Sequence, residues 1–166
     1  KSSVRERATI GFDFGTSSTK IVVQRNEVLG GGAAVALKVP EYFQCDNHPH
    51  LWVTTIWYSD QSGEFSLTKK EHFIEISDIK TQLMNLSIGS IQKVSSLLNP
   101  EFVAIAYLAF LIRVTVGWVS LEADFSDNKT VTDWAINLGI PAASLDNENM
   151  RKKMNAILAA AWLLAE

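Results

Sequence analysis

The sequence predicts an α/β fold: a mixed sheet of three or more antiparallel strands, followed by a helix, a further strand and a last helix. Three observations predict it. Apolar and polar side chains alternate in residues 9–25 on both sides of a glycine, as in two strands joined by a turn. Helix start signals stand at residues 99–101, and a second helical pattern follows the strand-like residues 133–144. Strands first and a helix, strand and helix after them imply helices packed on a mixed sheet.

The composition is that of one packed domain, so we expect a single lobe over residues 1–166. The hydrophobic fraction is 47%, the net charge is -3 and no basic run is present, which disfavours nucleic acid as a partner. The single cysteine, Cys45, cannot form an internal disulfide, and residues 1–10 lack the apolar core of a signal peptide. We therefore expect a cytoplasmic protein. Because the sequence stops inside an apolar helical pattern, we expect it to be a piece of a longer chain.

The first two strands flank the glycine turn. In residues 9–14 the alternation places Phe12 and Phe14 on one face and Asp13 on the other. Residues 19–25, rich in β-branched side chains, form the second strand.

The middle of the chain is less regular. Three glycines, residues 30–32, predict a turn. Residues 51–60 are aromatic and β-branched and predict one continuous strand, with residues 64–68 as its hairpin partner. Residues 80–98 are compatible with a helix or with a strand, broken at Gly89.

A long helix begins near residue 100. Asn99 as the cap, Pro100 at the first helical position and Glu101 in the first turn are start signals in the expected order. Residues 102–119 then continue as an almost wholly apolar helix.

A strand and a helix end the sequence. Residues 133–144 predict a buried strand that stops at a glycine and a proline. Ser144 or Asp146 is the predicted cap of the last helix. The apolar face of that helix consists of Met150, Met154, Ile157, Leu158 and Ala161.

The turn after the first strand is the candidate site. Its small residues supply backbone N–H groups and hydroxyls that suit phosphate: Gly15, Thr16, Ser17, Ser18 and Thr19. Asp13, at the strand end, can hold Mg²⁺ through water, because magnesium gives up its hydration shell reluctantly. Lys20 would add positive charge, although the alternation leaves its direction open. The competing interpretation is an ordinary hairpin, because Gly, Ser and Thr are common turn formers.

These residues resemble a known family. Residues 10–23, IGFDFGTSSTKIVV, are similar to the first phosphate motif of the actin, heat-shock chaperone and sugar kinase ATPase superfamily. Three other stretches resemble the seventy-kilodalton heat-shock chaperone (DnaK-like) branch. They are residues 53–63, where Thr54 stands in place of the usual proline, residues 99–112, which begin a helix with Pro-Glu, and residues 134–165, a strand before an alanine-rich helix.

The resemblance implies a ribonuclease H-like mixed sheet, the first lobe of an actin-like ATPase that binds ATP and Mg²⁺ between two lobes. It places Asp13 near the metal and Thr16 and Ser17 at the phosphates. It also implies a catalytic lysine near the transferred phosphate. Lys80 in DIKTQLMN is the best match, with a solvated lysine as the alternative. The implied partners are the second lobe of the same chain, ATP or ADP, and protein clients, and one lobe alone is expected to be inactive.

Two other functions stay open. The same motif suits the first lobe of a sugar kinase, although no sugar-contacting pattern follows it. A non-catalytic assembly or scaffold module with the same fold is the other, because the segment between the predicted third strand and the helix at Pro100 is short beside that of the chaperones.

Two further patterns have simpler interpretations. Residues 102–119 are long enough to span a bilayer, but the central Arg113 and the capped start favour a buried helix, and we expect no membrane partner. Cys45, His48 and His50 lack the spacing of a zinc site, so a polar loop is predicted there.

Overall fold

The computed structural model of the chain describes residues 6–26, 34–87, 98–121, 131–139 and 147–166. The strands within these ranges are β1 (Glu6–Phe14), β2 (Ser18–Asn26), β3 (Ala34–Ala36), β4 (Leu51–Val53), β5 (Ile56–Tyr58), β6 (Phe65–Ser66), β7 (Ile74–Ile76) and β8 (Val131–Leu138). The α-helices are α1 (Ile79–Ser87), α2 (Pro100–Leu121) and α3 (Glu148–Ala165), and Glu41–Phe43 form a short 3-10 helix.

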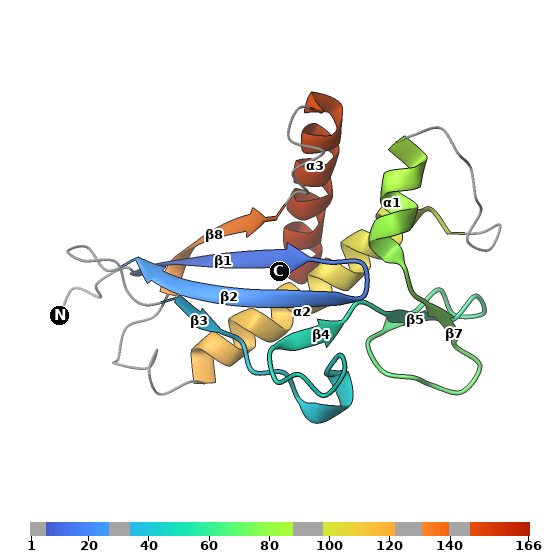
Figure 1. Ribbon diagram of the computed structural model, residues 1–166, viewed down its shortest axis with the longest axis horizontal. Helices are drawn as coiled ribbons and strands as arrows, with labels where there is room; N and C mark the ends of the chain where they lie inside the picture. Colours follow the sequence, from blue (N-terminus) through green and yellow to red (C-terminus); the bar gives the residue numbers. More distant parts are fainter. Residues whose placement is uncertain (1–5, 27–33, 88–97, 122–130, 140–146) are drawn as a thin grey trace.

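The larger sheet is mixed, as predicted (Figure 1). Its order is β3-β2-β1-β8, and β4 also pairs with β2. β1, β2, β3 and β4 pair antiparallel, whereas β8 runs parallel to β1. The chain then follows the predicted order of helix, strand and helix with α2, β8 and α3.

β8 is less buried than the sequence predicts. It pairs with β1 on one side and ends the described strand order, so it is an edge strand. Asp133 and Asn137 are exposed, while Trp134, Ile136 and Leu138 are only partly buried. The prediction of a buried strand was therefore wrong, because a sequence pattern does not say whether a second neighbour covers the strand.

The register between β1 and β2 sets the two faces of the sheet. Phe12 lies opposite Ile21, and both side chains are at most 2% exposed. Phe14 is also fully buried. Asp13 lies opposite Lys20, and both are exposed on the other face. The predicted alternation of the first strand is confirmed.

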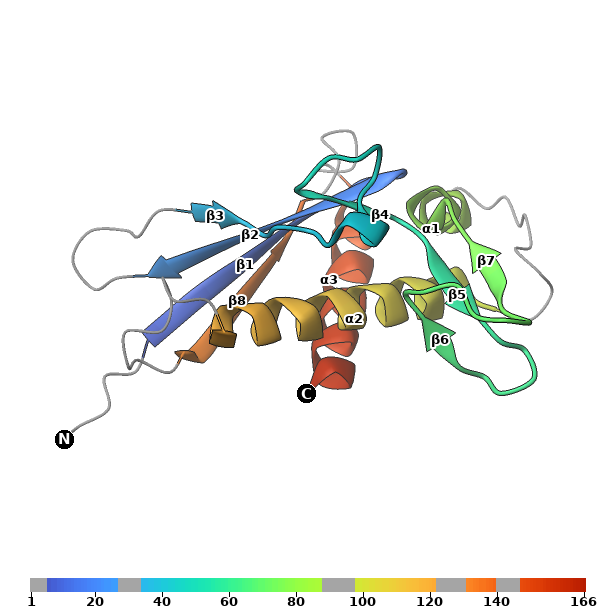
Figure 2. The same ribbon diagram turned by 90° about the horizontal axis from the view of Figure 1, so that it is seen from below.

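Both long helices cover the apolar face (Figure 2). Most of the buried apolar residues of α2 and α3 join Phe12 and Phe14 in one hydrophobic core. A salt bridge of 2.7 Å between Lys153 and Glu101 ties α3 to the start of α2. Leu158 and the four other predicted core residues of α3 are all buried, as expected from their spacing.

The helix caps agree in part with the sequence. The Asn99 side chain accepts a hydrogen bond of 2.9 Å from the backbone N–H of Glu101, as predicted for the start of α2. The cap of α3 is Asn147, whose side chain accepts from the N–H of Met150. Ser144 and Asp146, the predicted caps, lie outside the described residues.

Residues 51–60 form two strands rather than one. β4 belongs to the large sheet, and β5 belongs to a second sheet of order β6-β5-β7. The chain changes sheets at Thr54, whose backbone N–H donates to the carbonyl of Ser17 over 3.0 Å and whose side chain is buried. The hairpin partner predicted at residues 64–68 is present as β6.

The region left open between helix and strand begins as a helix, α1. Its predicted break at Gly89 lies outside the described residues, as does the predicted glycine turn at residues 30–32.

The two faces of β1 predict opposite responses to neighbouring substitutions. We expect Phe12→Ala to lower the free energy of unfolding by about 3–5 kcal/mol, because it leaves a cavity among α2 and β2 side chains. Asp13→Ala, on the open face, should change it by less than about 1 kcal/mol. Urea unfolding measures both, and equal losses for the two variants would contradict the assignment of faces.

Candidate functional site

The turn between β1 and β2 is tight. Three residues, 15–17, lie between Phe14 and Ser18, so the turn is shorter than the predicted residues 15–19. The N–H of Gly15 donates to the carbonyl of Ser18 over 2.9 Å. A Cβ at Gly15 would lie 2.3 Å from that oxygen, a distance that real Cβ atoms do not show. The closing hydrogen bond therefore depends on a residue without a side chain.

Of the candidate phosphate-binding side chains, some are exposed to solvent and one is buried in the core. Thr16 and Ser17 are exposed at the turn, and Ser18 is half-buried. Thr19 is fully buried, and its hydroxyl hydrogen-bonds the hydroxyl of Thr54 over 2.9 Å. The prediction that Thr19 contributes to a phosphate site was wrong, because its pairing opposite Phe14 turns its side chain to the apolar face.

Asp13 lies at the carboxyl edge of the sheet, where β1 and the parallel β8 end together. The N–H of Gly139, which follows β8, donates to the carbonyl of Phe12 over 2.7 Å. A Cβ at Gly139 would lie 3.3 Å from that carbonyl and 3.8 Å from Oδ1 of Asp13. The tighter of the two approaches is to the backbone of β1, so a side chain at Gly139 would press on the end of that strand, and the neighbouring Asp13 side chain is exposed. In α/β sheets, ligands bind outside the carboxyl ends of such strands.

Gly139 was not identified as a site residue from the sequence. The available signal was a glycine directly after an apolar strand, which indicates a close backbone approach as well as a strand end.

Lys20 is placed on the same face as Asp13. The alternation alone left its direction open, but the antiparallel register sets the two residues directly opposite each other. Cross-strand neighbours on one face have Cβ atoms about 5 Å apart. A carboxylate and an ammonium group therefore flank the start of the turn.

Lys80 is the second residue of α1 and is half-buried. Figures 1 and 2 both show α1 beside the turn between β1 and β2. Between the described residues, no hydrogen bond or ion pair joins Lys80 to the turn. Its role stays a prediction.

The groups exposed around the turn are of types that can bind phosphate and a hydrated Mg²⁺ ion. Oxygen ligands are what magnesium prefers, and the exposed carboxylate of Asp13 can hold a hydrated ion. The hydroxyls of Thr16 and Ser17 and the ammonium of Lys20 can donate to phosphate oxygens. These groups come from β1, the turn and β2, which the same ladder of hydrogen bonds holds together.

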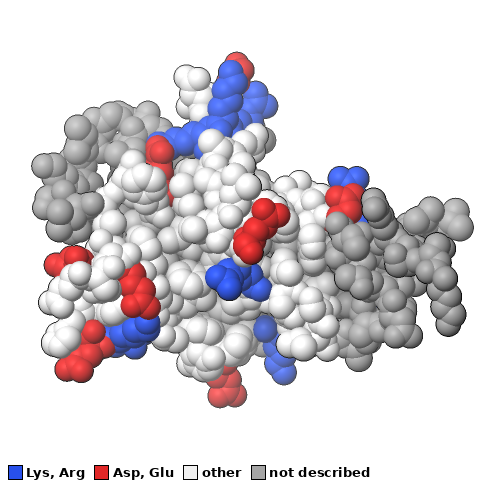
Figure 3. Space-filling model, turned by 180° about the vertical axis from the view of Figure 1, so that it is seen from behind, with Lys and Arg blue, Asp and Glu red and all other residues white. Residues whose placement is uncertain are grey.

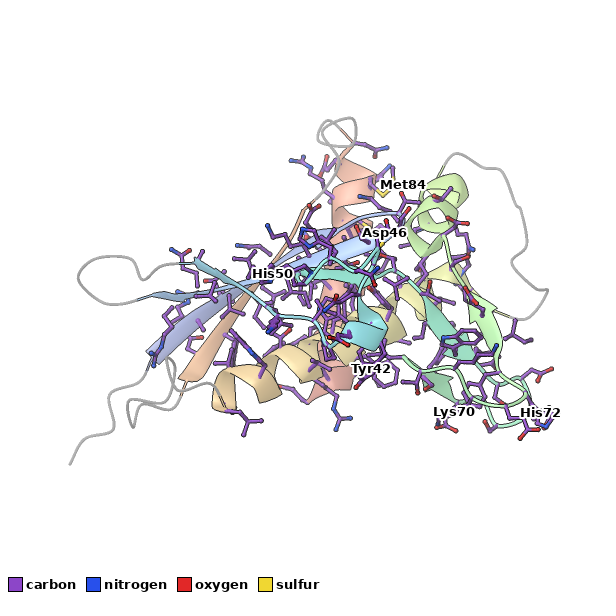
Figure 4. All side chains as sticks on the ribbon, turned by 60° about the horizontal axis from the view of Figure 1, so that its bottom comes forward. Tyr42, Asp46, His50, Lys70, His72 and Met84 are labelled. Carbon is purple, nitrogen blue, oxygen red and sulfur yellow. The ribbon has the colours of Figure 1, made fainter. Side chains whose placement is uncertain are left out.

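The loop of Cys45, His48 and His50 makes other contacts. The His50 ring hydrogen-bonds the carbonyl of Leu37 over 3.2 Å, and the His48 ring accepts from the N–H of His50. Burial, and then the neighbouring Asp46 carboxylate, raise the pKa of the Cys45 thiol. Figure 4 shows Asp46 and His50 on this loop. The part of the chain that the structure describes contains no group of three or more ligand-type side chains suited to a metal.

A groove of about 460 Å³ lies on the helix side, away from the turn, between α2, α3 and β8. Trp134 and Trp162 line it together with Arg113 and Glu166, and the Trp162 indole donates to the Glu166 carboxylate over 3.2 Å. Figure 3 views the molecule from this side, where most of the described surface is uncharged. None of the predicted site residues lines this groove.

The long apolar helix α2 is mainly a core element. By length and composition it is the one described helix that could cross a membrane, and 56% of its most apolar window is buried inside the protein. Its buried residues pack against β1 and α3. The core helix of a soluble protein passes the same test.

The chain was compared with protein-family models, with curated proteins and with solved structures, and none of them matches it.

A side chain at Gly15 should destabilise the fold, because its Cβ would collide with the carbonyl oxygen of Ser18. We expect Gly15→Ala to lower the free energy of unfolding by about 1–3 kcal/mol, because the turn must open and strain the start of β2. The matched control is Gly117→Ala in α2, where an added Cβ meets nothing within 4 Å. That variant should be stabilised by up to about 1 kcal/mol, since alanine is the better helix former. Thermal unfolding compares the two, and a Gly15→Ala variant as stable as Gly117→Ala would contradict the turn geometry.

Proposed function

We propose that the turn of residues 15–17, with Ser18 at the start of β2, binds the phosphates of a nucleotide, and that Mg²⁺ is held near Asp13 through water. The observation that carries the proposal is the exposed Asp13 carboxylate, one residue before the end of β1 at the sheet's carboxyl edge and two residues before the glycine that closes the turn. A hairpin needs neither an exposed aspartate at this edge nor the close approach of Gly139 to the carbonyl of Phe12.

The strand order supports a more specific version of the proposal. Antiparallel β3, β2 and β1, with β8 parallel to β1 after α2, are compatible with the ribonuclease H-like arrangement that the resemblance implies, and β4 to β7 and α1 are inserted between β3 and α2. We therefore propose the first lobe of an actin-like ATPase, nearest the seventy-kilodalton heat-shock chaperones. ATP hydrolysis would then belong to the complete two-lobed protein.

The residues of this chain would act by positioning and by charge. Thr16 and Ser17 would orient the phosphates, and Lys20 would offset their negative charge. Magnesium would supply the further neutralisation on which phosphoryl transfer depends. Closure of two lobes around the nucleotide would be the conformational result.

The competing functions give different outcomes. A sugar kinase shares this phosphate site, so phosphorylation of one member of a sugar panel, rather than hydrolysis alone, would select it. A scaffold module that has lost catalysis would neither hydrolyse ATP nor phosphorylate a sugar.

A titration with Mg-ATP tests the proposal. In the complete protein we expect Asp13→Ala to weaken Mg-ATP binding by about 10- to 100-fold, the usual loss when a group that holds a metal's ligand is removed. The matched control is Asp60→Ala, another exposed aspartate, in the loop between β5 and β6, which should bind like the wild type. Isothermal titration calorimetry measures the Mg-ATP affinity of the wild type and of both variants. Unchanged affinity in Asp13→Ala would remove Asp13 from the site.

A further inference from the structure

We propose that Thr54 is a positioning residue for the phosphate-binding turn and acts through Ser17 and Thr19. The inference rests on the proposed function and adds a residue that lies on a different strand connection, far along the chain from the turn.

Thr54 contacts the turn on both sides of Ser18. Its backbone N–H donates to the carbonyl of Ser17 over 3.0 Å. Its hydroxyl hydrogen-bonds the hydroxyl of Thr19 over 2.9 Å, and both side chains are at most 1% exposed. A buried hydrogen bond without competing water holds its partners in one arrangement. The orientation of Ser17, and with it of the exposed Thr16, is therefore set from outside the hairpin.

Tyr107 of α2 adds a third buried hydroxyl beside those of Thr19 and Thr54. We call these three side chains the buried anchor. Its hydroxyl donates to the carbonyl of Val53 over 3.1 Å. Burial raises the pKa of Tyr107 to about 12, and this effect outweighs that of the Thr19 and Thr54 hydroxyls, which lower it. Its ring lies 6.0 Å from that of Phe14, the residue before the turn. Three hydroxyls, from β2, from the connection of β4 to β5 and from α2, thus meet beneath the turn.

The anchor depends on the identity of residue 54. A proline at this position would have neither the N–H nor the hydroxyl and could make neither contact. The same threonine is where the chain leaves the large sheet for β5. A single buried residue therefore fixes the turn and changes the direction of the chain.

Substitution of Thr54 in the complete protein tests the inference. Thr54→Val keeps the shape and the N–H but removes the hydroxyl. We expect it to weaken Mg-ATP binding by about tenfold, the effect of one lost buried hydrogen bond, and to speed hydrogen exchange at the amide of Gly15 without nucleotide. Thr54→Ser, which keeps the hydroxyl, should restore both values to within about twofold. Thr55→Val is the matched control at the neighbouring half-buried threonine and should change neither.

The outcomes separate the inference from the proposed function. Wild-type affinity and exchange in Thr54→Val would overturn the inference, and so would a defect that Thr54→Ser fails to rescue. A wild-type protein that binds no Mg-ATP would overturn the proposed function, and the exchange of Gly15 would still decide the role of Thr54. If Thr54→Val does not fold, Tyr107→Phe takes its place. Faster exchange at Gly15 in that variant supports the anchor, and unchanged exchange overturns it.

Discussion

The antiparallel register between β1 and β2 is the constraint on which the fold and the site both depend. It is closed by the hydrogen bond from the N–H of Gly15 to the carbonyl of Ser18, and it sets Phe12 opposite Ile21. Since successive side chains of a strand point to opposite faces, a slip of one residue would move a strand's apolar set to solvent. A slipped β1 would also carry Asp13 under the helices, and burying an unpaired charge costs several kcal/mol. The core and the exposed carboxylate are thus two results of one pairing.

The site is assembled from parts of the chain that are far apart in sequence. The hairpin supplies the carboxylate, the hydroxyls and the lysine. β8 brings Gly139 to the same edge, where its N–H meets the carbonyl of Phe12. Thr54 and Tyr107 hold the underside of the turn through buried hydroxyls. A phosphate site needs donors that are already in place before the ligand arrives, because ordering them on binding would cost affinity. Under the proposed function, the buried hydroxyls of Thr54 and Tyr107 would provide that order and leave the exposed side of the turn to the ligand.

The sequence predicted correctly those features that depend on neighbouring residues along the chain. The alternation of β1, the cap at Asn99 and the apolar face of α3 follow from periodicity and hydrogen bonding within a few residues, and the structure has them. The break at Thr54 was missed, because it depends on a hydrogen bond to Ser17, which no window around residue 54 contains. The half-exposure of β8 was missed for a similar reason: it depends on which strands become neighbours.

The candidate site was also predicted only in part. Asp13 and the hydroxyls of the turn were found from one short stretch. The direction of Lys20 needed the register, and the inward turn of Thr19 needed its pairing opposite Phe14. Gly139 needed the parallel neighbour of β1. In each case the missing information was a partner across the sheet.

The central claim is that the turn itself receives the phosphates, and amide chemical shifts under titration with Mg-ATP test it most directly. We expect the largest shifts to fall on the amides of Gly15, Thr16 and Ser17 and to require Mg²⁺. Shifts confined to the groove around Trp162, or no shifts at all in the complete protein, would contradict it.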